Sequence, residues 1–158
     1  MREAHPDTLA GLAGALDDLV ALARRNIRVF DIDLSWGGWN SRARCDALAA
    51  YMRGSRNGRV EIIVHDTRWI EASGSRLTTL LQRYGHAMTI YRSGAGARHA
   101  MDPLTIVDDT HFLHRMHIDR LNATLSIGDA DRAGPLVERF QEIWATGEPG
   151  LAGTTLGL

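Results

Sequence analysis

The spacing of apolar residues predicts alternating helices and strands in the first half of the chain. Apolar side chains recur every three or four positions between Leu9 and Ala23, which is typical of an amphipathic helix. The β-branched, apolar run that follows predicts a buried strand. The pattern then repeats, so the predicted elements are a helix at 8–24, a strand at 26–34, a helix at 41–54, a strand at 59–66, a helix at 76–84 and a strand at 86–92.

The second half of the chain predicts short strands and one closing helix. Apolar stretches at 104–108, 111–116 and 123–127 have the length of strands, and the two residues between the first two predict a hairpin. An apolar stripe over 131–145 predicts the last helix, with Pro135 in its first turn, where a missing N–H matters little.

This order of elements is typical of an α/β layered domain. We expect a sheet of about six strands that is mixed in direction but parallel in its first half, with right-handed crossovers and helices on both faces. The length of 158 residues fits one domain, which we place at 1–146. The residues at 147–158 have no periodicity, which indicates a flexible C-terminal tail.

Composition limits the functions that this chain can have. Its 44% hydrophobic and 23% charged residues are ordinary for a globular protein, and a net charge of −1 provides no global field towards nucleic acid or acidic membranes. The chain shows no signal-peptide pattern and no apolar run of about 18 residues, so we expect a cytoplasmic protein that does not cross a membrane. All eighteen basic residues other than histidine are arginine, which excludes a Schiff base, a lysine general base and a P-loop lysine. Cys45 is the only cysteine, which excludes an intramolecular disulfide and a zinc site built from thiolates.

Polar side chains gather where the predicted strands end. Because ligands of open α/β sheets sit outside the carboxyl ends of the strands, we expect a small acidic and aromatic crevice there. The alternative is that these residues begin turns and cap helices. The candidate crevice residues, which include two from the last hairpin, are Asp33, Trp36, Asn40, His65, Asp66, Asp108, His114 and Arg115.

Two aspartate pairs suggest a specific chemistry. FDID and IVDD resemble the acidic motifs of haloacid dehalogenase-type phosphotransferases, in which Asp31 would be the nucleophile, Asp33 the acid/base and Asp108 or Asp109 a magnesium ligand. The absence of lysine and the strand that follows IVDD count against this hypothesis. His111, His114 and His117 do not predict a metal site, because a spacing of three on a strand sends neighbouring members to opposite faces. We expect neither a metal nor a cofactor.

The second half of the chain resembles the phospholipase D-like fold in its segments IVDD, HFLHR, DRLNATLSIGD and LVERFQEIW. More closely, the chain is similar to a family of small bacterial domains of unknown function with this fold, in the stretches VFDIDLSWGGWNSRARCDAL, RVEIIVHDTRWI, RLTTLLQRYGHAMTIYR and IVDDTHFLHR. The resemblance covers residues 26 to 145. Enzymes with the fold carry the motif H-x-K-x4-D, in which the histidine attacks phosphorus and the lysine steadies the charged intermediate.

The motif is incomplete in this chain. Its two possible registers place the histidine, lysine and aspartate positions at Met101, Pro103 and Asp108, or at Asp102, Leu104 and Asp109. Neither register keeps the nucleophile or the base. The resemblance therefore implies the scaffold without its usual catalysis, and no catalytic residue is assigned.

The resemblance implies a binding or interaction module that forms a homodimer, because phospholipase D-like enzymes pair two such domains about a two-fold axis. A relic anion site for a phosphate-bearing ligand would be lined by Arg115, Arg92, His114 and Asn122. The alternatives are a residual phosphodiesterase that uses His99 or His114, and the magnesium phosphatase. We do not expect a nucleic-acid partner, because the arginines are spread along the chain and balanced by acids.

Overall fold

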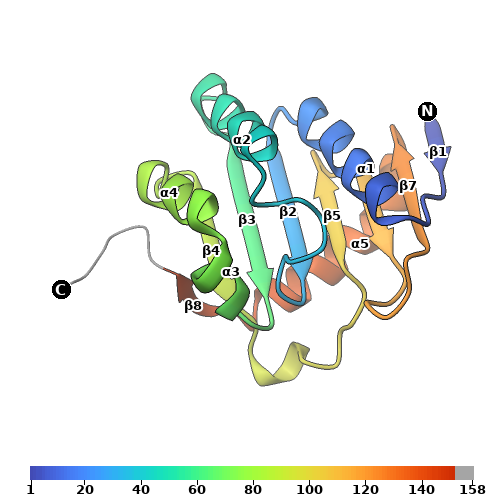
Figure 1. Ribbon diagram of the computed structural model, residues 1–158. Helices are drawn as coiled ribbons and strands as arrows, with labels where there is room; N and C mark the ends of the chain where they lie inside the picture. The colour runs from blue at the N-terminus through green and yellow to red at the C-terminus, as the bar shows by residue number, and fades with distance from the viewer. Residues whose placement is uncertain (152–158) are drawn as a thin grey trace.

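A mixed sheet of eight strands, in the order β1-β7-β6-β5-β2-β3-β4-β8, forms the centre of the molecule (Figure 1). The computed structural model describes residues 1–151. The elements are β1 (Arg2–Ala4), α1 (Leu9–Leu22), β2 (Asn26–Asp31), α2 (Arg42–Gly54), β3 (Arg59–Val64), α3 (Arg68–Ser73), α4 (Ser75–Arg83), β4 (Met88–Arg92), the 3-10 turn η1 (Ala95–Ala97), β5 (Leu104–Val107), β6 (His111–Arg115), β7 (Ala123–Ile127), α5 (Ala130–Trp144) and β8 (Glu148–Leu151).

Strand direction divides the sheet into two halves. β2, β3 and β4 are parallel, as the alternation of helices and strands predicted. β5 then runs antiparallel to β2, and β6 and β7 continue as an antiparallel meander. The predicted hairpin between β5 and β6 is present, with Asp108 and Asp109 in the left-handed region at φ 55° and 56°. Aspartate tolerates this conformation better than most residues, so the turn forms without glycine.

Helices cover both faces of the sheet, also as predicted (Figure 1). α1, α2, α3 and α4 pack on one face and α5 on the other. The middle of β2 shows how both faces are buried: Val29 packs in the layer beneath α1 to α4, whereas its neighbour Phe30 packs in the layer beneath α5. Because successive strand residues point to opposite faces, a strand covered on both sides needs apolar residues at both parities.

Five expectations about the elements need correction. The sheet has eight strands rather than about six, because β1 and β8 add to its two edges. α3 had not been predicted at all. The supposed tail contains β8, which pairs with β4; residues 152–158 lie outside the described residues. The β5–β6 turn has three residues rather than two, since Val107 pairs with His111. Pro135 is not in the first turn of α5, which begins five residues earlier at Ala130. Among the described residues, no helix has the length and apolar character needed to cross a membrane.

Candidate functional site

The parallel strands β2, β3 and β4 all finish at one end of the sheet, which we call the polar end. Since β5 runs the other way, it begins at the polar end, and β6 finishes there. Asp31 at the end of β2 and Arg115 at the end of β6 therefore lie at the same end of the sheet. The long connection that contains η1 and the 116–122 loop close this end.

Asp108 is not part of the polar end, which corrects the expected crevice. Its strand β5 is antiparallel to β2, so Asp108 follows Val107 beside the start of β2. Its carboxylate accepts hydrogen bonds from the backbone N–H groups of Arg24, Arg25 and Asn26 at 2.7–3.2 Å. Five residues of β2 at about 3.3 Å each separate this position from Asp31. Asp108 holds the turn between α1 and β2, and Asp109 pairs with Arg28 at 2.7 Å.

A buried polar cluster lies at the polar end beneath the helices of the first layer. The Arg115 side chain is 5% exposed, and its guanidinium lies 4.7 Å from the ring centre of Trp36. It also donates to the carbonyl groups of Arg120 and Ile118, at 2.5 and 2.7 Å. These bonds fasten the 116–122 loop. Arg115 is thus oriented by the protein itself.

Asp31 belongs to the same cluster and is 1% exposed. Burial raises its pKa to about 7, against weaker opposing effects from the Trp36 indole N–H, the Ile32 N–H and the Arg115 charge. Oδ1 of Asp31 accepts from the Ile32 N–H at 2.6 Å. Among the described residues, Oδ2 of Asp31, Nε1 of Trp36 and Nη1 of Arg115 are buried and make no hydrogen bond of ordinary geometry, so the Trp36 N–H influences Asp31 without a well-formed hydrogen bond. Three such atoms in one cluster leave room for polar contacts that the protein does not itself supply.

A second network lies on the opposite face of the sheet, against α5. Nε2 of His114 lies 2.7 Å from Oδ2 of Asp102, and Arg139 on α5 donates two hydrogen bonds to the same carboxylate. Burial alone would raise the pKa of Asp102, but the hydrogen bonds from His114 and Arg139 outweigh burial and lower it to about 2. The His114 side chain is 20% exposed. The arrangement orients one imidazole at the polar end, beside a carboxylate and a guanidinium.

His65 holds the long connection between β4 and β5. Its Nδ1 lies 2.5 Å from the Ser93 hydroxyl, and its Nε2 lies 2.6 Å from the Ala100 carbonyl. A carbonyl oxygen can only accept a hydrogen bond, so Nε2 of His65 carries the proton and donates it to Ala100. Nδ1 then accepts a hydrogen bond from the Ser93 hydroxyl. Both ring nitrogens are therefore engaged. These two contacts position the connection between β4 and β5.

The three remaining crevice candidates act locally. Oδ1 of Asn40 accepts from the backbone N–H groups of Arg76 and Leu77 and so caps α4. Asp66 accepts from the backbone and side chain of Arg68 at the start of α3, and the side-chain hydrogen bond from Arg68 lowers its pKa to about 2. Asp33 accepts from the Ser35 N–H in a turn. For these positions the capping interpretation was the better one.

Neither the relic anion site nor the magnesium site assembles. Arg92 on β4 pairs with Glu148 of β8. β4 lies four strand positions from β6, which carries Arg115, so the two arginines do not meet. Asp31 and Asp108 lie at opposite ends of β2. Within residues 1–151, no three histidine, cysteine, aspartate or glutamate side chains gather as a metal site would require.

Sequence reasoning found Trp36, His114 and Arg115 but missed the partners of His114. Asp102 appeared only as an alternative motif position, and Arg139 lies 37 residues further along the chain. Its position on the α5 stripe, one residue before Phe140, was the signal that it lies near the sheet. Nothing in the sequence shows which strand it meets.

Comparison with solved structures places this arrangement among phospholipase D-like folds. The structure matches Nuc from Salmonella typhimurium, described as a phospholipase D family member, with a TM-score of 0.67 and 15% identity over 96% of this chain and 99% of that chain. NucT from Helicobacter pylori matches with a TM-score of 0.61 and 14% identity, over 94% and 99% of the two chains. TrmBL2, an archaeal chromatin protein, matches with a TM-score of 0.71 and 12% identity over 95% of this chain and 54% of its own length, so this chain spans about half of it. Identities this low show the fold alone.

The sequence also identifies the family. Residues 8–152 match the domain of unknown function DUF7931, and the chain belongs to that family. No curated protein compared with the chain matches it. The expected phospholipase D-like fold and the membership in a domain family of unknown function are thus confirmed.

Proposed function

We propose that this domain is a non-catalytic phospholipase D-like module. The observation that carries the proposal is the content of the motif positions. In the register that ends at Asp108, a thioether (Met101) and a proline ring (Pro103) stand where the fold's enzymes hold an imidazole and an ammonium group. Neither can attack phosphorus or steady its charge. The one retained member, Asp108, is engaged by three backbone N–H groups.

A chromatin protein of similar fold supports this proposal, because it indicates that the scaffold is not confined to enzymes named for phosphoester chemistry. The fold by itself fixes no activity.

A residual phosphodiesterase is the second candidate, and the His114–Asp102 pair favours it. A carboxylate that holds one nitrogen of an imidazole prepares the other for proton transfer or attack. Arg139 counts against this candidate. Its guanidinium donates two hydrogen bonds to Asp102, so these donors are not available to hold the phosphate of a substrate.

Hydrolysis of bis-nitrophenyl phosphate, a generic phosphodiester, distinguishes these candidates. We expect no turnover above background by the purified full chain, with or without magnesium. Turnover that His114→Ala abolishes would establish the phosphodiesterase instead. Magnesium-dependent turnover that Asp31→Asn abolishes would establish the phosphatase. Arg98→Gln is the matched control, because Arg98 is an exposed residue outside both networks.

We further propose that the module forms a homodimer through the polar end. The 116–122 loop exposes Met116 (43%) and Leu121 (37%), two of the five large hydrophobic side chains that are exposed in the described part of the chain. The Ile118 N–H donates to the Met101 carbonyl at 2.8 Å, so this loop lies over the degenerate motif. Removing these apolar side chains from water would favour association with a second copy.

Sedimentation equilibrium at micromolar concentration tests the dimer. We expect twice the monomer mass for the full chain and the monomer mass for the double variant Met116→Asp, Leu121→Asp. Leu9→Asp is the matched control, since Leu9 is exposed (53%) on α1 and should leave the dimer intact. A monomeric parent chain, or a dimer that the double variant does not dissociate, would refute this interface.

A further inference from the structure

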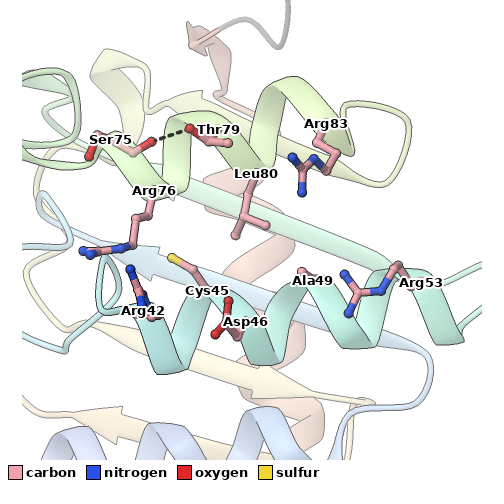
Figure 2. Close-up of a pocket in the computed structure, with 10 residues that line it drawn as sticks. All are labelled: Arg42, Cys45, Asp46, Ala49, Arg53, Ser75, Arg76, Thr79, Leu80 and Arg83. Atoms are coloured by element: carbon pink, nitrogen blue, oxygen red, sulfur yellow. Dashed lines mark hydrogen bonds between the residues drawn. The ribbon is translucent and has the colours of Figure 1, made fainter.

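A groove between α2 and α4, whose lining includes no residue of the polar cluster, is lined by four arginines. The cavity has a volume of about 320 Å³. Arg42 and Arg76 stand at one end of it, Arg53 and Arg83 at the other, and Cys45, Ala49 and Leu80 lie between the two helices (Figure 2). Its size is that of a small-ligand site.

Helical geometry explains why the arginines meet. Arg42 and Arg53 are eleven residues apart on α2, and Arg76 and Arg83 are seven apart on α4. These separations correspond to about three and two turns at 3.6 residues per turn, so the two arginines of each helix lie on one side of that helix. The packing of α2 beside α4 then brings the two sides together. Arg42 with Arg76 forms one arginine pair of the groove, and Arg53 with Arg83 forms the other. The two pairs are separated by about 16 Å along α2, at 1.5 Å per residue.

The positive charge of the groove is not neutralised by the protein. None of its four guanidinium groups has a carboxylate within 4.0 Å in the described part of the chain. Arg53 donates to the Tyr84 hydroxyl and Arg76 to the Asn40 carbonyl, both of which are uncharged. The one carboxylate in the lining is Asp46, between the two pairs.

The surroundings extend this positive field. A second cavity of about 200 Å³, beyond the C-terminal end of α2, is lined by Arg56, Arg59 and His86. Residues 42–98 contain ten arginines and four acidic residues, although the whole chain has a net charge of −1. The charges that balance over the whole chain are therefore unevenly divided along it, and the groove gathers four arginines from this segment that are unpaired within residues 1–151. A nucleic-acid partner had not been expected because the arginines are balanced by acids, and at the groove this reason does not hold.

We propose that the α2–α4 groove binds the phosphate backbone of a single-stranded nucleic acid. Paired guanidinium groups suit phosphate because they donate planar, charge-assisted hydrogen bonds. A strand carries its charge only on spaced phosphates, so it can reach both arginine pairs while a neutral sugar or base lies over Asp46. An acidic helical peptide would place carboxylates along the whole groove, including over Asp46, and is disfavoured by repulsion. The lining offers no aromatic side chain for stacking, so the contact depends on charge and not on sequence.

Fluorescence anisotropy with a labelled oligothymidine and the full chain tests the proposal. Four neutralised phosphates predict a slope of log affinity against log salt of about −3, or about a 50-fold loss between about 50 and 200 mM salt. The double variant Arg42→Gln, Arg83→Gln removes one guanidinium from each end. Neither side chain makes a hydrogen bond or ion pair with any residue in the described range 1–151, so the fold should be unaffected. The slope should fall to about −1.4, with about a sevenfold loss over the same range.

Two further variants separate the groove from general charge. Arg2→Gln with Arg98→Gln removes the same charge outside the groove and should retain most of the affinity and nearly the parent slope. Asp46→Asn should raise the affinity, because it removes the carboxylate between the two arginine pairs that repels the phosphates of the strand. This gain cannot result from damage to the fold.

Three results would overturn the proposal. They are an absence of salt-dependent binding by the parent chain, equal losses in the groove and control double variants, and binding of labelled polyglutamate as tight as that of the oligonucleotide. The last result would point to an acidic protein partner. Each outcome is independent of the turnover and mass measurements at the polar end.

Discussion

Asp108 should contribute to stability, although the phospholipase D-like motif would assign its position to an active site. We consider the substitution Asp108→Asn. Asparagine retains the shape of the side chain and tolerates the left-handed backbone at φ 55°. It keeps one acceptor oxygen for Arg25 and Asn26, whose N–H groups lie 2.7 and 3.0 Å from Oδ1. Its NH2 group would face the Arg24 N–H, which lies 3.0 Å from Oδ2, so that two donors meet.

The expected loss follows from these contacts. A hydrogen bond to a charged group contributes about 1.5–3 kcal/mol, and the substitution removes the charge and one such bond, so we expect a loss of about 2–3 kcal/mol. Asp109→Asn is the matched control in the same turn, with φ 56°. The Asp109 side chain is 47% exposed and its ion pair with Arg28 should contribute about 0–1 kcal/mol.

Urea unfolding followed by tryptophan fluorescence measures the difference. For a slope of about 2 kcal/mol/M, the midpoint of Asp108→Asn should fall about 1 M below that of the parent chain, and that of Asp109→Asn by less than about half of that. Equal midpoints for the two variants would refute the structural role of Asp108. A large loss for Asp109→Asn alone would do the same.

Three other predictions concern buried groups and the sheet edge. Because burial raises the pKa of Asp31 to about 7 from 3.8, its contribution to stability is fully present below about pH 4 and is lost as the pH rises towards 7. Urea midpoints should therefore fall between about pH 4 and pH 7, and they should fall less in Asp31→Asn; an unchanged pH dependence in that variant would contradict the burial argument. Burial raises the pKa of the Cys45 thiol to about 11, so iodoacetamide at about pH 8 should modify it, by mass spectrometry, only when urea unfolds the chain; rapid modification of the folded protein would show an open thiol. Truncation after Gly147 removes β8 from the edge of β4 and should lower the urea midpoint, whereas a truncated chain as stable as the parent would show that residues 148–158 do not contribute to stability.

The sequence predicted the elements that carry their own periodicity. α1, α2, α5 and the parallel strands have apolar spacing that is long and regular enough to read. β1 and β8 do not: they have three and four residues, and β8 contains Pro149 and Gly150. Such strands form because an existing edge offers backbone partners, and this information lies in the tertiary structure. Pro135 was misplaced because helix ends are set by caps, here Asp129, and not by the apolar stripe.

The candidate site was less predictable, because it depends on strand direction and on which helices are neighbours. Asp108 was placed with Asp31 on the assumption that every polar strand end meets at one end of the sheet. The antiparallel direction of β5 separates them, and no residue of β5 encodes that direction. The arginine pairs on α2 and α4 could each be read from helical spacing, but the packing that joins them could not. Asn40 shows the same limit, since the helix that it caps begins 35 residues later.

The fold therefore divides its polar residues into two kinds. At the polar end, Asp31, Arg115, His114 and Asp102 are largely engaged with one another or with the backbone. In the α2–α4 groove, the four arginines are exposed and have no acidic partner among residues 1–151. This distribution supports our proposal that a ligand binds in the groove and not at the polar end.

The position of a bound phosphate analogue tests that claim most directly. Crystals of the full chain grown or soaked with tungstate would show where a tetrahedral anion binds, without interference from contaminating hydrolases. We predict tungstate at one end of the α2–α4 groove, between Arg42 and Arg76 or between Arg53 and Arg83, and none within hydrogen-bond distance of His114. Tungstate held by the His114 imidazole at the polar end would contradict the account and would restore a catalytic role to this domain.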